Sequence, residues 1–115
     1  MKEIVDKIIE ERNRQEGLWK EQNWPSVMGY IPAIHYNIPS MNEAKETCEE
    51  RKSIGQLTWT DIVLEEMCEV VEATSDENRI EELTQLSALC IAWIQSIKRN
   101  PGKDFKQINK QNEKQ

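Results

Sequence analysis

Apolar residues recur at intervals of three and four along four stretches of the chain, a spacing that predicts four α-helices. The first predicted helix runs from about Lys2 to Lys20. The segment from Asn23 to Ser40 contains three prolines and a glycine, so it cannot continue that helix. Eighteen residues without regular structure are long for a compact domain, and loops of this length are often lids or binding segments.

Cap residues mark the ends of the other three predicted helices. A Ser, Thr or Asp just before a helix accepts a hydrogen bond from a first-turn N–H group, and Gly or Pro follows the last turn. Ser40 and Glu43 begin the second predicted helix, and Gly55 ends it. Thr58 and Asp61 begin the third, which ends at about Thr74. Ser75 or Asp76 begins the fourth, which ends near Asn100-Pro101-Gly102.

The predicted fold class is therefore all-α, with one helical domain over residues 1–100. Residues 101–115 form a polar tail in which Phe105 and Ile108 are the sizeable apolar residues, so we expect the tail to be disordered. A length of 115 residues fits a single domain.

The charge and the composition of the chain argue against several classes of function. The net charge of −6 argues against a protein that coats nucleic acid, because such domains carry a basic face. No apolar run approaches the roughly 18–20 residues of a membrane span, and no signal peptide is recognisable. Three cysteines without a CxxC pair favour neither disulfides nor zinc, and we expect all three to be small core residues. These features predict a soluble, cytoplasmic protein.

The third predicted helix carries a group of carboxylates. On a helical wheel Glu65, Glu66 and Glu69 share one arc with Ile62, opposite an apolar half. An acidic solvent-facing surface is the simpler interpretation. Against it, three like charges on one stripe repel each other, and Ile62 would be stranded among them.

The fourth predicted helix places a carboxylate among apolar residues. Leu86, Leu89 and Trp93 all lie within about 40° of Glu82 on the wheel, and Gln85 borders the same stripe. A carboxylate there is costly unless it is paired, protonated or bound to a cation. The alternatives are an ion pair with Arg12 or Arg79, a frayed helix start, or a metal site. If the two helices are neighbours, Glu66, Glu69, Glu82 and Gln85 offer the oxygen ligands that suit Mg²⁺ or Mn²⁺.

The first predicted helix has a stripe that changes from apolar to polar. It begins with Val5 and Ile8 and continues through Arg12, Gln15 and Trp19. A guanidinium, an amide and an indole near a cation site could contact a phosphate, a base edge and a base face, respectively. The simpler alternative is an ordinary surface turn in which Trp19 packs on the core.

Four blocks of sequence, in order, resemble the MazG-like all-α nucleoside triphosphate pyrophosphohydrolases, and most closely the small phage-type members. The resemblance covers about residues 10 to 98, apart from most of the loop. The blocks are Glu11-Arg12-Asn13-Arg14-Gln15 through Trp19, Gly55-Gln56-Leu57-Thr58-Trp59, Glu65-Glu66-Met67-Cys68-Glu69, and Glu82-Leu83-Thr84-Gln85 with Ala92-Trp93-Ile94.

The resemblance implies a four-helix bundle, completed by assembly into a homodimer or homotetramer. It also implies cleavage of an NTP or dNTP to the monophosphate and pyrophosphate, with Mg²⁺ or Mn²⁺ held by Glu66, Glu69, Glu82 and Gln85. The implied catalytic residues are Glu65 and Glu66, with Glu65 positioning water. The implied substrate-binding residues are Arg12, Gln15, Trp19 and Lys20. Gln85 departs from the Asp of the broader family, which removes one negative charge from the expected ligand set.

Two other functions fit the same residues. A protein that binds or sequesters nucleotides with little turnover would keep the pocket, and Gln85 and the long loop favour it. A structural helical module would instead use Glu82 in an interface salt bridge. The residues do not distinguish among bases or sugars.

Overall fold

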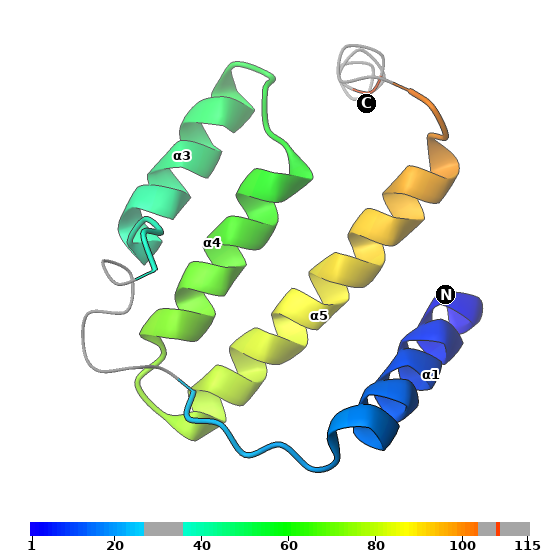
Figure 1. The fold of residues 1–115 in the computed structure, drawn as a ribbon. Coiled ribbons are helices and arrows are strands. Elements are labelled where there is room, and N and C mark those ends of the chain that lie inside the picture. Colours follow the sequence, from blue (N-terminus) through cyan, green and yellow to red (C-terminus); the bar gives the residue numbers. More distant parts are fainter. Residues whose placement is uncertain (27–35, 104–107, 109–115) are drawn as a thin grey trace.

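The computed structural model describes residues 1–26, 36–103 and 108, and the fold within them is all-α (Figure 1). Four helices and no strand occur in these ranges. The helices are α1 (Lys2–Trp19), α3 (Met41–Ser53), α4 (Trp59–Glu72) and α5 (Asp76–Arg99). The predicted fold class and the four predicted helices are confirmed. Most of the predicted loop (Asn23 to Ser40) and most of the predicted tail (101–115) lie outside the described residues.

Helix α4 is the central element of the fold. It packs against α3 on one side and against α5 on the other, so that the three helices form a layer (Figure 1). Trp59 near the start of α4 stacks on Trp93 near the end of α5, with ring centroids 6.5 Å apart. The two helices are therefore antiparallel, joined by the short turn at 73–75.

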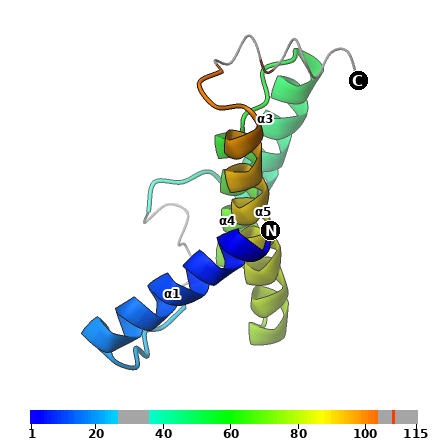
Figure 2. The same cartoon turned by 90° about the vertical axis from the view of Figure 1, so that its right-hand side faces the viewer.

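Helix α1 is attached much more loosely. Among the described helices it contacts only α5, which it crosses near its own N-terminus before diverging (Figure 2). A single chain thus forms a three-helix layer with one flanking helix, and a closed four-helix bundle stays a prediction that depends on a second chain.

The predicted caps explain where the helices begin. Ser40 Oγ accepts a hydrogen bond from the Glu43 N–H at 3.2 Å, and Ser75 Oγ accepts one from Asn78 N–H at 3.1 Å. Thr58 and Asp61 form a complete capping box. Gly55, with φ of +69°, follows the end of α3. The sequence signals were right because caps depend on neighbours three residues away and not on tertiary packing.

Arg79 caps the C-terminus of α4. Its Nε donates to the Val70 carbonyl at 3.1 Å and its Nη2 to the Ala73 carbonyl at 2.6 Å. These carbonyls belong to the last turn, where intrahelical partners are lacking. The guanidinium therefore links the end of α4 to the start of α5.

We expect Arg79→Ala to lower the free energy of unfolding by about 1–3 kcal/mol, because partly buried carbonyls lose charged donors. Urea unfolding followed by tryptophan fluorescence measures this loss. Arg99→Ala, which removes an exposed arginine from the last turn of α5, is the control. Equal losses in the two variants would contradict the capping role.

The hydrophobic core of the single chain is small. The buried apolar residues of the described chain are Ile4, Ala44, Cys48, Cys68, Val70 and Val71. Cys48 and Cys68 confirm the prediction of small core residues, but Cys90 is exposed and that part of the prediction is wrong.

Candidate functional site

Three carboxylates from α4 and α5 converge between the two helices. Glu66, Glu69 and Glu82 each offer an oxygen, and these oxygens all lie within 4.8 Å of one another. Glu66 and Glu69 are neighbours one turn apart on α4, and the antiparallel packing of α5 brings Glu82 beside them. The structure thus brings together the three acidic residues that the sequence singled out as metal ligands.

The site is buried in part, and two of its oxygens lack a donor among the described residues. Glu66 is 8% exposed, and among the described residues it is the charged residue that is classed as buried. Glu66 Oε1 and Glu82 Oε2 are both inaccessible to solvent and have no hydrogen-bond partner within the described residues. A buried polar atom without a partner costs about 1–3 kcal/mol, and more when the group is charged. These two oxygens mark a place where a cation or a proton is needed.

The alternatives for Glu82 do not fit this geometry. Arg79 is occupied by the carbonyls at the end of α4, and Arg12 donates to Gln15 Oε1 at 3.0 Å. In the described part of the chain no ion pair involves Glu82. A frayed helix start does not apply either, because Ser75 caps α5 and Glu82 lies in its second turn.

The electrostatics of the cluster favour protonation when no cation is present. Burial, together with the neighbouring carboxyl groups of Glu82 and Glu69, raises the pKa of Glu66 to about 8. Burial also raises the pKa of Glu69, with a contribution from the charge of Glu82. A proton and a divalent cation are therefore expected to compete for the same oxygens.

Glu65 and Gln85 lie at the edges of this site. Glu65 faces the α3 side of α4, where its carboxylate contributes, after burial, to raising the pKa of the Cys48 thiol to about 12. It still lies close enough to raise the pKa of Glu69 slightly. Gln85 is exposed, one turn after Glu82 on α5. The predicted roles of Glu65 in positioning water and of Gln85 as a ligand stay predictions.

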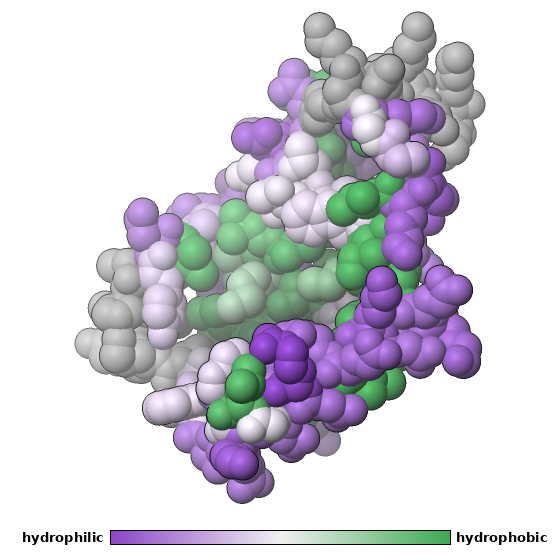
Figure 3. Space-filling model, turned by 45° about the vertical axis from the view of Figure 1, so that its right-hand side comes forward, coloured by the Kyte–Doolittle hydropathy of each residue, from purple (hydrophilic) through white to green (hydrophobic). Residues whose placement is uncertain are grey.

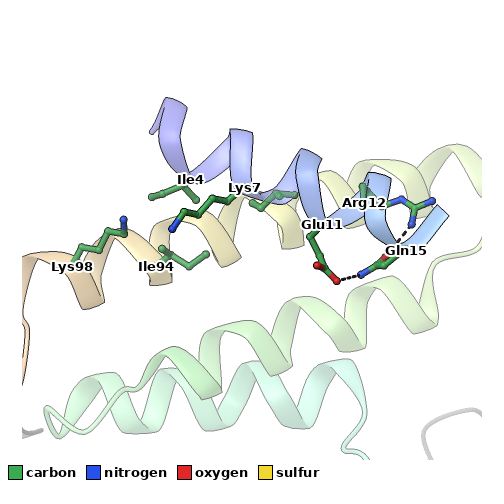
Figure 4. Close-up of a pocket in the computed structure, with 8 residues that line it drawn as sticks. Ile4, Lys7, Glu11, Arg12, Gln15, Ile94 and Lys98 are labelled. Carbon is green, nitrogen blue, oxygen red and sulfur yellow. Dashed lines mark hydrogen bonds between the residues drawn. The ribbon is translucent and has the colours of Figure 1, made fainter. Parts of the chain in front are cut away.

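Two of the predicted substrate-binding residues line a groove between α1 and α5 (Figure 4). Gln15 accepts a hydrogen bond from Arg12 Nη1 and donates one to Glu11 Oε1 at 3.1 Å. The groove has a volume of about 440 Å³. Its lining comprises Ile4, Lys7, Ile8, Glu11, Arg12, Gln15, Ile94 and Lys98.

The other two predicted substrate-binding residues lie outside this groove. Trp19, the last residue of α1, is 53% exposed and does not pack on the core. Lys20 follows it with φ of +60° and ends the helix. Sequence reasoning placed Arg12, Gln15 and Trp19 on one stripe, but only Arg12 and Gln15 line the groove with α5.

The end of the groove that Ile94 and Lys98 line is distant from the carboxylate cluster. Ile94 follows Glu82 by twelve residues of continuous helix, or about 18 Å along α5. Helix α1 has no close backbone contact with α4, which carries two of the three carboxylates. Lys7 and Lys98, which supply two of the three cations of the groove, were missed by the sequence analysis. Lys7 lies near the start of α1 and Lys98 near the end of α5, and no local sequence pattern shows that these two positions are close in space.

Comparisons with known proteins add no identification. No family model, no curated protein and no solved structure matches this chain. Within the described residues, none of the helices combines the length and the hydrophobicity of a membrane span.

Proposed function

We propose that this chain is a divalent-cation-dependent nucleoside triphosphate pyrophosphohydrolase. In this proposal Glu66, Glu69 and Glu82 hold Mg²⁺ or Mn²⁺, and an NTP or dNTP is cleaved to the monophosphate and pyrophosphate. The four sequence blocks that resemble MazG-like proteins support the substrate class. The observation that carries the proposal is the pair of buried oxygens, Glu66 Oε1 and Glu82 Oε2, that lack a partner in the described chain.

The donor set fits the proposed cation. Three carboxylates within 4.8 Å of one another provide hard oxygen ligands, which suit Mg²⁺ and Mn²⁺ better than zinc. When bound, the cation supplies positive charge that offsets the charge of phosphate oxygens during phosphoryl transfer. Gln85 could add a neutral carbonyl oxygen, so the chain's own negative charge at the site comes from the three glutamates.

The protein's residues have distinct proposed tasks. The burial of Glu66 keeps its carboxylate partly shielded from water, which strengthens its interaction with a cation. Glu65, the residue before Glu66 on α4, is proposed to position the attacking water. Arg12 and Gln15, already hydrogen-bonded to each other, present a guanidinium and an amide for a phosphate and a base. Trp19 and Lys20 are proposed to contribute a flat apolar surface and a charge.

The direct test is to incubate the chain with a panel of NTPs and dNTPs and Mg²⁺ or Mn²⁺, and to identify the products. Monophosphate with pyrophosphate, lost in Glu69→Gln, supports the proposal. Tight nucleotide binding without products favours the sequestering protein. Neither binding nor turnover favours a structural module, and either of these two results contradicts the proposed hydrolase.

We expect Arg12→Ala to weaken nucleotide binding by about 1.5–3 kcal/mol, the range for a hydrogen bond to a charged group. Titration calorimetry with a nucleotide and Mg²⁺ measures the change. Arg14→Ala is the matched control, because it removes the same charge from an exposed pair with Glu11 on another side of α1. Equal losses in both variants would indicate a diffuse electrostatic effect and contradict a specific contact.

The proposed assembly into a homodimer or homotetramer has separate support in the large apolar side chains that α5 exposes, since Ile80, Leu83 and Ile97 are 64%, 45% and 59% exposed.

A further inference from the structure

The groove between α1 and α5 has an apolar floor. Ile4 and Ile8 line it from α1 and Ile94 lines it from α5, and Ile8 keeps 43% of its surface exposed. A space-filling view shows apolar side chains gathered in a hollow, with hydrophilic side chains along its border (Figure 3). Apolar surface that a chain leaves in a concave place is typical of a ligand site.

Two lysines line one end of this groove. Lys7 extends from α1 and Lys98 from α5, and both point toward the end near Ile4 and Ile94 (Figure 4). In the described part of the chain, no ion pair involves either ammonium group. Two positive charges beside apolar walls attract an anion, because such walls concentrate the electric field of the charges.

The polar groups at the opposite end of the groove are paired with each other. Arg12 Nη1 donates to Gln15 Oε1, and Gln15 Nε2 donates to Glu11 Oε1. Hydrogen bonds from Arg14 and Gln15 lower the pKa of Glu11 to about 2, so this carboxyl group is charged at neutral pH. Since these charges balance one another, the charge of an anionic ligand belongs at the other end, beside the two lysines.

The size of the groove limits the kind of ligand. Its volume of about 440 Å³ lies near the lower end of the range for ligand pockets, roughly 300–1,000 Å³. From Ile4 to Gln15 it follows α1 for eleven residues, or about 16 Å. A space of this volume and length suits one extended hydrocarbon chain and is too small for the two chains of a phospholipid.

The phosphates of a nucleotide do not account for the two lysines. In the proposed function the phosphates bind with the cation at the carboxylate cluster, and Ile94 lies about 18 Å along α5 from Glu82. The isoleucine side chains of the floor also offer no hydrogen bond to the edge of a base. The lysine end of the groove therefore fits a different anion.

We propose that this groove binds a single-chain anionic amphiphile, an alkyl carboxylate of medium chain length. The carboxylate lies between Lys7 and Lys98, whose compact ammonium groups supply both charge and hydrogen-bond donors. The alkyl chain lies along Ile94 and Ile8 and displaces water from the apolar floor. Binding requires neither a metal nor a nucleotide, so failure of this proposal and failure of the proposed hydrolase are separate results.

The first test is titration calorimetry of the full chain with dodecanoate below its critical micelle concentration, with a chelator and without nucleotide. Saturable binding is expected, and the affinity should fall about twofold to fourfold for each methylene group removed, as measured with decanoate and octanoate. Dodecyltrimethylammonium, which has the same chain and a positive head group, should bind at least tenfold more weakly. Absence of dodecanoate binding, equal binding of the cationic amphiphile, or affinity independent of chain length overturns the proposal.

The second test addresses the head group. Lys7→Gln combined with Lys98→Gln in one chain should weaken dodecanoate binding by about fivefold, because two exposed ion pairs are lost. Lys45→Gln combined with Lys52→Gln is the matched control, since it removes two exposed lysine charges from α3. Equal losses in the two double variants would show a diffuse charge effect and overturn the assigned position of the carboxylate.

The third test addresses the alkyl chain. Ile8→Ser should weaken dodecanoate binding by about fivefold or more, because it removes apolar surface from the groove. Ile9→Ser is the control, since Ile9 is 52% exposed on the same helix and does not line the groove. Circular dichroism verifies that each variant is folded. A loss in Ile9→Ser that equals the loss in Ile8→Ser overturns the groove as the site.

A last measurement separates a free amphiphile from a membrane surface. The chain is sedimented with vesicles of phosphatidylcholine and phosphatidylglycerol, and it should stay in the supernatant, because its net charge of −6 is repelled by anionic lipid. Cosedimentation that is lost when Lys7 and Lys98 are both replaced by Gln would mean that the lysines bind a lipid surface, and it would overturn the proposal.

Discussion

Addition of Mg²⁺ or Mn²⁺ to the metal-free chain is expected to raise its unfolding temperature by about 10–20 °C. A cation that binds only the folded chain, at a free concentration of one hundred times its Kd, adds about 2.7 kcal/mol of stability. For a domain of this size each kcal/mol corresponds to roughly 4–8 °C. The physical reason is that Glu66, Glu69 and Glu82 converge with two buried oxygens that have no partner in the described chain. Differential scanning calorimetry with and without the metal measures the shift.

Glu82→Gln is expected to abolish this metal response. Removing the charge of Glu82 also relieves repulsion with Glu66, so the same variant should be as stable as the wild type, or more stable, without metal. Glu81→Gln is the control, because Glu81 is the exposed neighbour of Glu82 on α5 and loses the same charge. A metal-induced shift that persists in Glu82→Gln would contradict the assignment of this residue as a ligand.

The metal-free chain is expected to lose stability as the pH rises from about 4.5 to about 8. Glu66 has an ordinary pKa of 4.5 when unfolded and a pKa of about 8 in the folded chain, because of burial and its carboxyl neighbours. The folded state therefore holds a proton that the unfolded state releases. That stabilisation is complete below pH 4.5 and disappears as the pH passes through the folded pKa. Urea unfolding in the presence of a chelator, at several pH values, measures the slope.

Glu66→Gln should remove most of this pH dependence, since the amide cannot titrate. Glu46→Gln, an exposed carboxylate on α3, is the control and should leave the slope unchanged. Saturating Mg²⁺ should also flatten or reverse the slope in the wild type, because the cation replaces the proton at the same oxygens. A wild-type profile without a fall toward pH 8 would contradict a protonated, buried Glu66.

The local features of this protein were readable from its sequence. The helix boundaries followed from Ser40, Thr58, Ser75 and Gly55, because capping joins residues only three positions apart. The unusual position of Glu82 followed from the helical period alone, since its neighbours on the wheel are leucines and a tryptophan. These inferences concern single helices, for which sequence spacing determines geometry.

The environment of the carboxylates was decided by the tertiary structure. The sequence allowed an acidic, solvent-facing arc on α4, but this helix lies between α3 and α5 and has two covered sides. Glu66 is buried for that reason, and an amphipathic pattern cannot show it, because the pattern does not tell how many neighbours a helix has. Arg79 illustrates the same limit. The sequence allowed an ion pair between Arg79 and Glu82. In the structure the chain reversal after α4 brings the carbonyls of Val70 and Ala73 within hydrogen-bonding distance of Arg79 instead.

The position of Arg12 and Gln15 relative to the carboxylates also depended on the fold. Arg12 and Gln15 share a stripe on α1 with residues that contact α5, and the sequence correctly placed that stripe on a packing face. It could not determine which part of α5 the stripe meets. Because α1 is joined to the other helices through a long segment and packs loosely, few local constraints fix its position. Sequence periodicity thus determined which side chains share a helix face. Long-range packing determined which helices are neighbours, and with that the burial and the pKa values of the carboxylates.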